Sequence, residues 1–189
     1  MPDAEAEELM RSAWAKRRAS FDAPPEEKLA LLTRAQVDLT SAATMCRDQA
    51  SPVSHAHAIH LLANVEVDLG HQERALSLWE EAVELLRATD DFLQLAHKVR
   101  HLGDLHRHCD RLSDADVCYS EALTIYRAHD GEGSLDFANA IRRMAKLKEL
   151  QGDRTQALAL WRETRESYAA IEMTPGVEEA DACIARLTD

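Results

Sequence analysis

A residue pattern that recurs at intervals of 40 and 42 residues constrains this chain more than any other feature. The segments LANVEVDLGHQERALSLWEEAVELL (62–86), LGDLHRHCDRLSDADVCYSEALTIY (102–126) and MAKLKELQGDRTQALALWRETRESY (144–168) share one layout of small and aromatic residues. Its members are Ala75, Trp79 and Ala82 in the first copy, Ala115, Tyr119 and Ala122 in the second, and Ala157, Trp161 and Thr164 in the third, with a fainter copy at Ala35, Leu39 and Ala42. Such a period is typical of solenoids, in which each unit packs only on its neighbours.

Each copy is predicted to form a helix, a tight turn and a second helix. Gly70 and Gly152 stand where the first helix must end, because the left-handed conformation that closes many helices favours glycine, and Asp110 takes that place in the middle copy. Two pairs are candidate N-caps for the second helices: Ser113 with Asp116, and Asp153 with Gln156. No segment alternates convincingly as a strand, so we expect an all-α fold.

The period also predicts the organisation of the chain, which we expect to be a single domain over residues 1–189. Residues 1–50 would hold N-terminal helices and the degenerate copy, residues 51–90, 91–132 and 133–173 three repeats, and residues 174–189 a capping helix. Met10, Ala13 and Trp14 share one stripe of the first helix with Leu9, and a stripe of this kind usually faces a core. We therefore expect Trp14 to be packed.

This pattern resembles the tetratricopeptide repeat (TPR) family. The resemblance rests on the Leu62-Ala63, Leu102-Gly103 and Met144-Ala145 pairs, the residue at each turn, and the small and aromatic residues that follow; it covers about residues 51–188. The copies are longer than the usual ~34 residues, as in the kinesin-light-chain variant. The resemblance implies a right-handed superhelical solenoid of antiparallel helix pairs with a C-terminal capping helix.

Composition and charge narrow the function. Lys and Arg number 22 against 34 Asp and Glu, giving a formal net charge of -12, so we expect no nucleic-acid partner, since phosphate attraction needs a basic surface. The acidic start MPDAEAEELM is unlike a secretory signal, and no apolar run approaches the ~20 residues that a membrane span needs. We expect a cytoplasmic protein with no membrane partner and unpaired, scattered cysteines.

A concentration of basic residues marks the candidate site. In the TPR family one side of each first helix lines a concave groove that holds the ligand. The matching positions are His57, His60 and Asn64 in the first repeat, His97, Arg100, His101, Asp104, Arg107 and His108 in the second, and Asn139, Arg142, Arg143 and Lys146 in the third. Helical spacing independently gathers the second set on one broad face. Because most acids fall on the second helices and outer faces, we predict a cationic groove.

Metal binding and catalysis are the rival interpretations of this stretch. His97 and His101 are four residues apart on a helix, a spacing that can chelate Zn²⁺, and His57 or His60 could approach them. The glutamate of an H-E-x-x-H motif is missing, and Arg100 would repel a cation. No nucleophile elbow, P-loop or glycine-rich cradle is present. We therefore expect no metal, no cofactor and no enzymatic activity.

The sequence thus favours a non-enzymatic adaptor that binds an acidic segment of a partner protein or peptide. Protonation of groove histidines would strengthen binding as the pH falls toward ~6.5. A sensor of a small anionic ligand or signalling peptide, and a self-associating scaffold, remain alternatives, so a homo-oligomer is possible. Some TPR proteins grip a terminal carboxylate; Asn64 and Arg143 match that clamp, whereas His60, His101 and Asn139 do not.

Overall fold

The computed structural model describes residues 2–129 and 133–188, and this part of the chain is almost entirely helical. Its helices are α1 (Pro2–Ala19), α2 (Pro25–Asp48), α3 (Pro52–Asp68), α4 (Gln72–Arg87), α5 (Phe92–His108), α6 (Leu112–Ala128), α7 (Leu135–Leu150), α8 (Arg154–Ala170) and α9 (Thr174–Thr188). No strand occurs in the two described ranges. The prediction of an all-α fold built from helix-turn-helix repeats is confirmed.

The turns between paired helices follow the expected chemistry. Gly70, Asp110 and Gly152 have positive φ angles of 84°, 59° and 77°. In each turn the amide of the next residue donates to a carbonyl five residues back, as from His71 to Glu66 at 2.8 Å, which satisfies the end of the first helix. These three positions therefore share one left-handed backbone conformation, which Asp and Asn as well as glycine can adopt.

One of the two predicted caps is confirmed and the other is wrong. Asp153 Oδ1 accepts a hydrogen bond from the Gln156 amide at 2.9 Å and caps α8. Ser113 does not cap α6, because that helix begins at Leu112, the residue before Ser113, and Arg111 occupies the N-cap position. The turn at Asp110 closes in the same number of residues as the glycine turns, which leaves Ser113 inside the first helical turn.

The repeated small and aromatic residues form the core. Ala75, Ala115 and Ala157 are fully buried, and the aromatic residues beside them, Trp79, Tyr119 and Trp161, are buried as well. Alanine at a helix crossing lets two backbones approach closely, and the adjacent ring fills the remaining volume. The upstream residues Ala35, Leu39 and Ala42 are also buried, so α1 and α2 form a further helix pair with the same packing.

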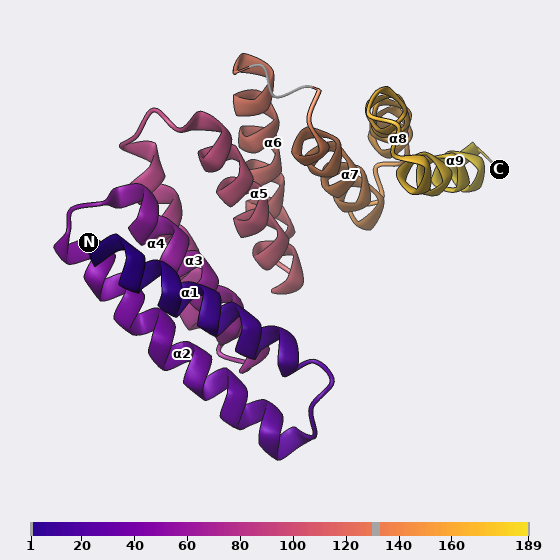
Figure 1. Cartoon of the computed structure of the whole chain (residues 1–189). Coiled ribbons are helices and arrows are strands. Elements are labelled where there is room, and N and C mark those ends of the chain that lie inside the picture. Colours follow the sequence, from indigo (N-terminus) through magenta and orange to yellow (C-terminus); the bar gives the residue numbers. More distant parts are fainter. Residues whose placement is uncertain (1, 130–132, 189) are drawn as a thin grey trace. The chain divides into compact units, whose positions relative to one another are not determined.

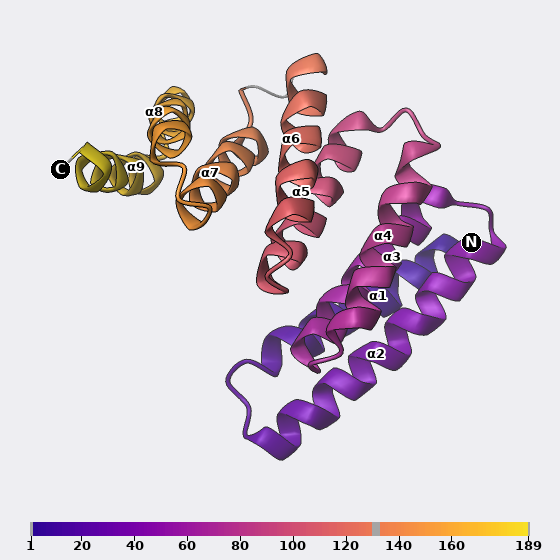
Figure 2. The same cartoon turned by 180° about the vertical axis from the view of Figure 1, so that it is seen from behind.

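The chain divides into two compact units, residues 1–91 and residues 92–189. In unit 1, α2 packs against α1 and α3, and α3 packs against α4 (Figures 1 and 2). In unit 2, α5 to α9 each pack on the next helix, and α5 also contacts α7. The division into three repeats with flanking helices within one domain stays a prediction.

The two terminal helices differ in how they bury their apolar stripes. In α9, Ala180 packs with Ala145 and Trp161, and Ile184 is partly buried against the same cluster. In α1, Met10 and Ala13 are buried, but Trp14 is 43% exposed. The prediction that Trp14 faces the core is therefore wrong: its indole lies at the edge of the stripe, where the guanidinium of Arg17 is 5.2 Å from the ring centre. Within the described residues, no helix combines the length and apolar character needed to cross a bilayer.

Candidate functional site

Asp104 of α5 is the centre of the candidate site in unit 2. Its Oδ1 accepts a hydrogen bond from the Tyr119 hydroxyl at 2.7 Å and lies 3.3 Å from Nε of Arg143 on α7. Its Oδ2 lies 3.4 Å from Nη1 of Arg100, one turn earlier on α5. Tyr119 is fully buried, so its hydrogen bond ties the carboxylate of Asp104 to the core of the repeat. One side chain thus joins the arginines of two neighbouring first helices.

A second carboxylate, Asp136, stands in the first turn of α7. Its Oδ2 is 3.3 Å from Nδ1 of His97, and its Oδ1 is 3.7 Å from Nη2 of Arg100. The hydrogen bond from His97 lowers the pKa of Asp136, and the charge of Arg100 adds to this effect. Arg100 is 5% exposed, so Asp104 and Asp136 provide the negative charge that a buried guanidinium needs.

The third carboxylate comes from the capping helix. Glu179 of α9 accepts two hydrogen bonds from Arg142, from Nε at 2.6 Å and from Nη2 at 3.0 Å, and lies 2.7 Å from Nζ of Lys146. Partial burial alone would raise the pKa of Glu179, but the hydrogen bonds and charges of Arg142 and Lys146 outweigh it, so the pKa is lowered. The capping helix α9 therefore places a negative charge beside the cations of α7.

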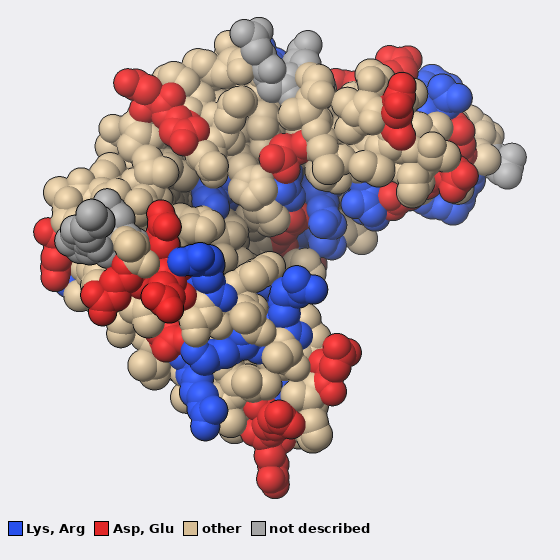
Figure 3. All heavy atoms as spheres, in the orientation of Figure 1, with Lys and Arg blue, Asp and Glu red and all other residues tan. Residues whose placement is uncertain are grey.

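These pairings correct the predicted separation of charges. We expected the acids to lie largely away from the groove positions, yet Asp136 and Glu179 join Asp104 among the cations. Lys and Arg atoms lie among those of Asp and Glu on the surface as well (Figure 3). The expectation was wrong because it considered only the second helices and outer faces, whereas these acids come from the start of a first helix and from the capping helix.

The electrostatics also correct the predicted role of His101. Its Nε2 is 2.8 Å from Nη2 of Arg100, and its ring centre is 4.6 Å from that of His97. Burial and the neighbouring cations, Arg100 first among them, lower the pKa of His101 to about 2. This ring stays neutral between pH 8 and pH 6, so it adds no positive charge to the site in that range.

The remaining predicted residues of unit 2 surround this network. Asn139 Oδ1 accepts a hydrogen bond from the Tyr168 hydroxyl at 2.8 Å, which joins α7 to α8. His108 is exposed, with Nδ1 2.7 Å from the backbone oxygen of Asp104. Arg107 is half-buried on the same helix. The structure therefore brings together Arg100, His101, Asp104 and Arg143, and it gives Asn139 a position in the interhelical packing.

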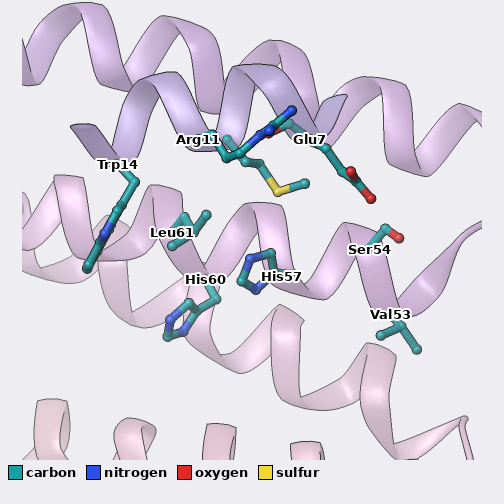
Figure 4. Close-up of a pocket in the computed structure, with 9 residues that line it drawn as sticks. Glu7, Arg11, Trp14, Val53, Ser54, His57, His60 and Leu61 are labelled. Atoms are coloured by element: carbon teal, nitrogen blue, oxygen red, sulfur yellow. The ribbon is translucent and has the colours of Figure 1, made fainter. Parts of the chain in front are cut away.

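The three predicted residues of unit 1 lie on α3. His60 is buried, with its ring edge-on to Trp79 at 4.3 Å between centres and its Nε2 3.3 Å from Nδ2 of Asn64. His57 is exposed one turn earlier and stacks on His60 at 6.2 Å. With residues of α1, His57 and His60 line a pocket of about 760 Å³ (Figure 4). A groove that continues from α3 to α5 stays a prediction.

The His97–His101 pair was also the candidate metal site. Within residues 2–129 and 133–188, no three His, Cys, Asp or Glu side chains are grouped so as to hold a metal ion. Instead, His97 contacts Asp136 and His101 contacts Arg100.

Sequence reasoning missed three residues of the site and one elsewhere. Asp136 lies two residues after Ser134, whose Oγ accepts a hydrogen bond from the Phe137 amide at 3.1 Å and caps α7. A serine at this place in the sequence could therefore have predicted that Asp136 lies in the first turn of a helix. Glu179 could not be assigned a partner without the packing of α9, and Tyr119 was considered only as core. In unit 1, Glu66 is fully buried, with its carboxylate 2.7 Å from His71 Nδ1 and within hydrogen-bonding distance of two further side chains.

Comparison with known proteins shows similarity in structure alone. No protein-family profile and no curated protein sequence matches this chain significantly. BtubC (BKLC) from P. vanneervenii aligns over 100% of this chain and 90% of its own, with a TM-score of 0.60 and 16% identity. A Rap protein solved in complex with competence and sporulation factor aligns over 95% of this chain and 47% of its own, with a TM-score of 0.78 and 14% identity.

A third similar structure is the signal transduction ATPase with numerous domains (STAND) from Pyrococcus horikoshii, which has a tetratricopeptide repeat sensor. It aligns over 95% of this chain and 27% of its own, with a TM-score of 0.77 and 15% identity. This chain therefore spans less than half the length of the Rap and STAND proteins. The architecture is that of TPR-like helical repeats, as the sequence pattern predicted.

Proposed function

We propose that this chain is a non-enzymatic adaptor that binds an acidic segment of a partner protein on the α5–α7 face of unit 2. The observation that carries the proposal is a row of four cations that share three carboxylates. The cations are Arg100, Arg142, Arg143 and Lys146, and the carboxylates are Asp104, Asp136 and Glu179. The row has an excess of positive charge in a chain whose net charge is -12.

The carboxylates hold the cations in place without using all their hydrogen-bonding capacity. A guanidinium has five N–H donors, and Arg143 contacts Asp104 through Nε at 3.3 Å. The side chains of Arg143 and Lys146 are 30% and 35% exposed, so a ligand can reach them. Cations already fixed by their neighbours lose little conformational entropy when they bind a ligand carboxylate. Displacing a partly exposed internal ion pair costs about 0–1 kcal/mol, less than a good charge-assisted hydrogen bond contributes.

A sensor of a small anion or signalling peptide is the second candidate function. It is favoured by the similarity to a Rap protein solved with competence and sporulation factor, which shows that a related architecture can hold such a factor. A self-associating scaffold would place an acidic segment of another copy on the same face. Titration with peptides, small anions and the protein itself separates these three cases.

The test is isothermal titration calorimetry with acidic, neutral and basic peptides of equal length. Replacing Arg142 and Arg143 by Ala should weaken acidic-peptide binding by about 1–3 kcal/mol for each charge-assisted hydrogen bond removed, or roughly tenfold or more. Arg165→Ala is the matched control, because this arginine pairs with Asp181 on α9 and is not among the four cations. Equal binding by the double variant and the control, or a preference for basic peptides, would refute the proposal.

A further inference from the structure

Unit 1 contains a trough whose chemistry differs from that of the α5–α7 face. It runs between α1 and α3, with Trp14 on one wall and Val53, His57 and Leu61 on the other (Figure 4). Met10 of α1 also lines it. Its volume is about 760 Å³, within the range of pockets that bind ligands. Trp14 and Val53 are 43% and 41% exposed, so both walls present large apolar side chains to solvent.

The charges on the trough indicate that its ligand is uncharged. Glu7 and Arg11 lie one turn apart on α1 and carry opposite charges, and the lining residues of α3 include no Asp, Glu, Lys or Arg. A segment that carries a net charge would lose solvation here and would meet one charge of the same sign beside each charge of opposite sign, so the pair would offset little of that cost, whereas an apolar segment avoids it. The exposed side chains of Trp14 and His57 also favour an aromatic ring, which can pack against either.

The length of the trough indicates the size of the segment. Val53 and Leu61 are eight residues apart on α3, which at 1.5 Å per residue corresponds to about 12 Å. An extended peptide covers this distance in about four residues and places two alternate side chains on one side. A site of this length is larger than one side chain requires and matches a short linear segment.

We propose that the α1–α3 trough binds a short, uncharged segment of a partner protein through two alternate apolar side chains, at least one of them aromatic. This site is independent of acidic-segment binding in unit 2, because it uses none of the four cations. Burial of Trp14 and Val53 by the segment removes apolar surface from water, which supplies the driving force.

Trp14 provides a direct signal for the test. The chain has three tryptophans, and Trp79 and Trp161 are 2% and 0% exposed, so a change in acrylamide quenching on binding reports mainly on Trp14. The probe is a neutral hexapeptide with two Phe residues at alternate positions and no Trp; the control peptide has Ala in their place. We expect the Phe peptide to shift the emission to shorter wavelength, to reduce quenching by acrylamide, and to bind at least tenfold more tightly than the Ala peptide.

Val53→Asp is the diagnostic variant. Val53 lies in the first turn of α3, where a carboxylate is compatible with the helix dipole, so the fold should tolerate the change. It should weaken the Phe peptide at least tenfold, whereas Val37→Asp, at a 60% exposed position of α2 outside the trough, should change binding less than twofold. Arg142→Ala/Arg143→Ala should leave this binding unchanged, which separates failure here from failure of the acidic-segment proposal.

Several results would overturn the inference. Equal affinity for the Phe and Ala peptides, or equal effects of the two aspartate variants, would show that the trough does not recognise apolar side chains. Binding of the uncharged dye N-phenyl-1-naphthylamine without binding of any peptide would assign the trough to a small molecule. Self-association that Val53→Asp abolishes, measured by sedimentation velocity, would assign it to a second copy of the chain.

Discussion

Gly103→Ala should destabilise unit 2 and disturb its proposed binding face at the same time. A Cβ atom at Gly103 would lie 2.7 Å from Cε1 and 2.8 Å from Cδ1 of Tyr119, and 3.1 Å from Cβ of Cys118. Contacts this short force the ring of Tyr119 to move. Because that ring is fully buried and its hydroxyl donates to Asp104 at 2.7 Å, the movement is transmitted to the carboxylate that joins Arg100 and Arg143.

Three contributions determine how much the unfolding free energy changes in Gly103→Ala. Replacing glycine by alanine inside a helix stabilises it by about 1 kcal/mol. Overpacking a closely packed core costs about 1–3 kcal/mol. Weakening the hydrogen bond from a buried tyrosine to a carboxylate costs up to about 1.5–3 kcal/mol. The unfavourable contributions are larger, so we expect a net loss of about 1–3 kcal/mol of unfolding free energy, together with weaker binding of acidic peptides.

The assay is urea unfolding followed by circular dichroism, paired with calorimetry on the folded variant. Gly133→Ala is the control, because a Cβ there meets nothing within 4 Å; its unfolding free energy should change by less than about 0.5 kcal/mol. If Gly103→Ala is as stable as the original chain and binds acidic peptides equally well, the proposed coupling between the core ring and Asp104 does not exist.

Three further outcomes are expected. Trp161→Ala should destabilise the protein by about 3–5 kcal/mol in thermal or urea unfolding, because it empties a fully buried volume; a loss below about 1 kcal/mol would contradict the predicted core. Glu179→Gln should tighten acidic-peptide binding severalfold in calorimetry. The substitution should cost about 1 kcal/mol or less of stability at pH 7. This difference should disappear as the pH falls below 4.5, because the pKa of Glu179 is lowered in the folded state and the carboxylate stabilises the fold only while it is ionised. Tag-free protein should carry less than one equivalent of zinc by elemental analysis, and a chelator should leave its Tm unchanged; stoichiometric zinc that disappears on replacing His97 and His101 by Ala would refute this.

The sequence predicts the fold well because the repeat multiplies a weak local signal. A single alanine such as Ala115 says little, but its recurrence with an aromatic residue four positions later fixes the register of three helix pairs. The misplaced cap at Ser113 shows the limit of local motifs. The start of α6 follows from the geometry of the turn at Asp110, and a suitable hydroxyl one residue later cannot move it.

The candidate site was predicted less completely, because its chemistry depends on packing between helices. Periodicity places Arg142 and Lys146 on one face of α7, but only the packing of α9 shows that Glu179 neutralises part of their charge. The pKa of His101 likewise depends on its burial beside Arg100, which no spacing rule reports. Sequence patterns identify which residues share a face, whereas partners contributed by other helices decide the charge of that face.

Comparison of equivalent repeat positions explains how one scaffold acquires different binding chemistry. His60, Arg100 and Arg142 occupy the same position in successive repeats. The ring of His60 packs against Trp79 beside an apolar trough, Arg100 is buried between two aspartates, and Arg142 faces the capping helix. The alanine and aromatic positions that define the architecture are unchanged by these differences. The recognition we propose depends on a few exchangeable side chains at these positions. Structures 14–16% identical to this chain share its fold, but that similarity does not imply the same side-chain chemistry, so the proposed ligands rest on this chain's own surface.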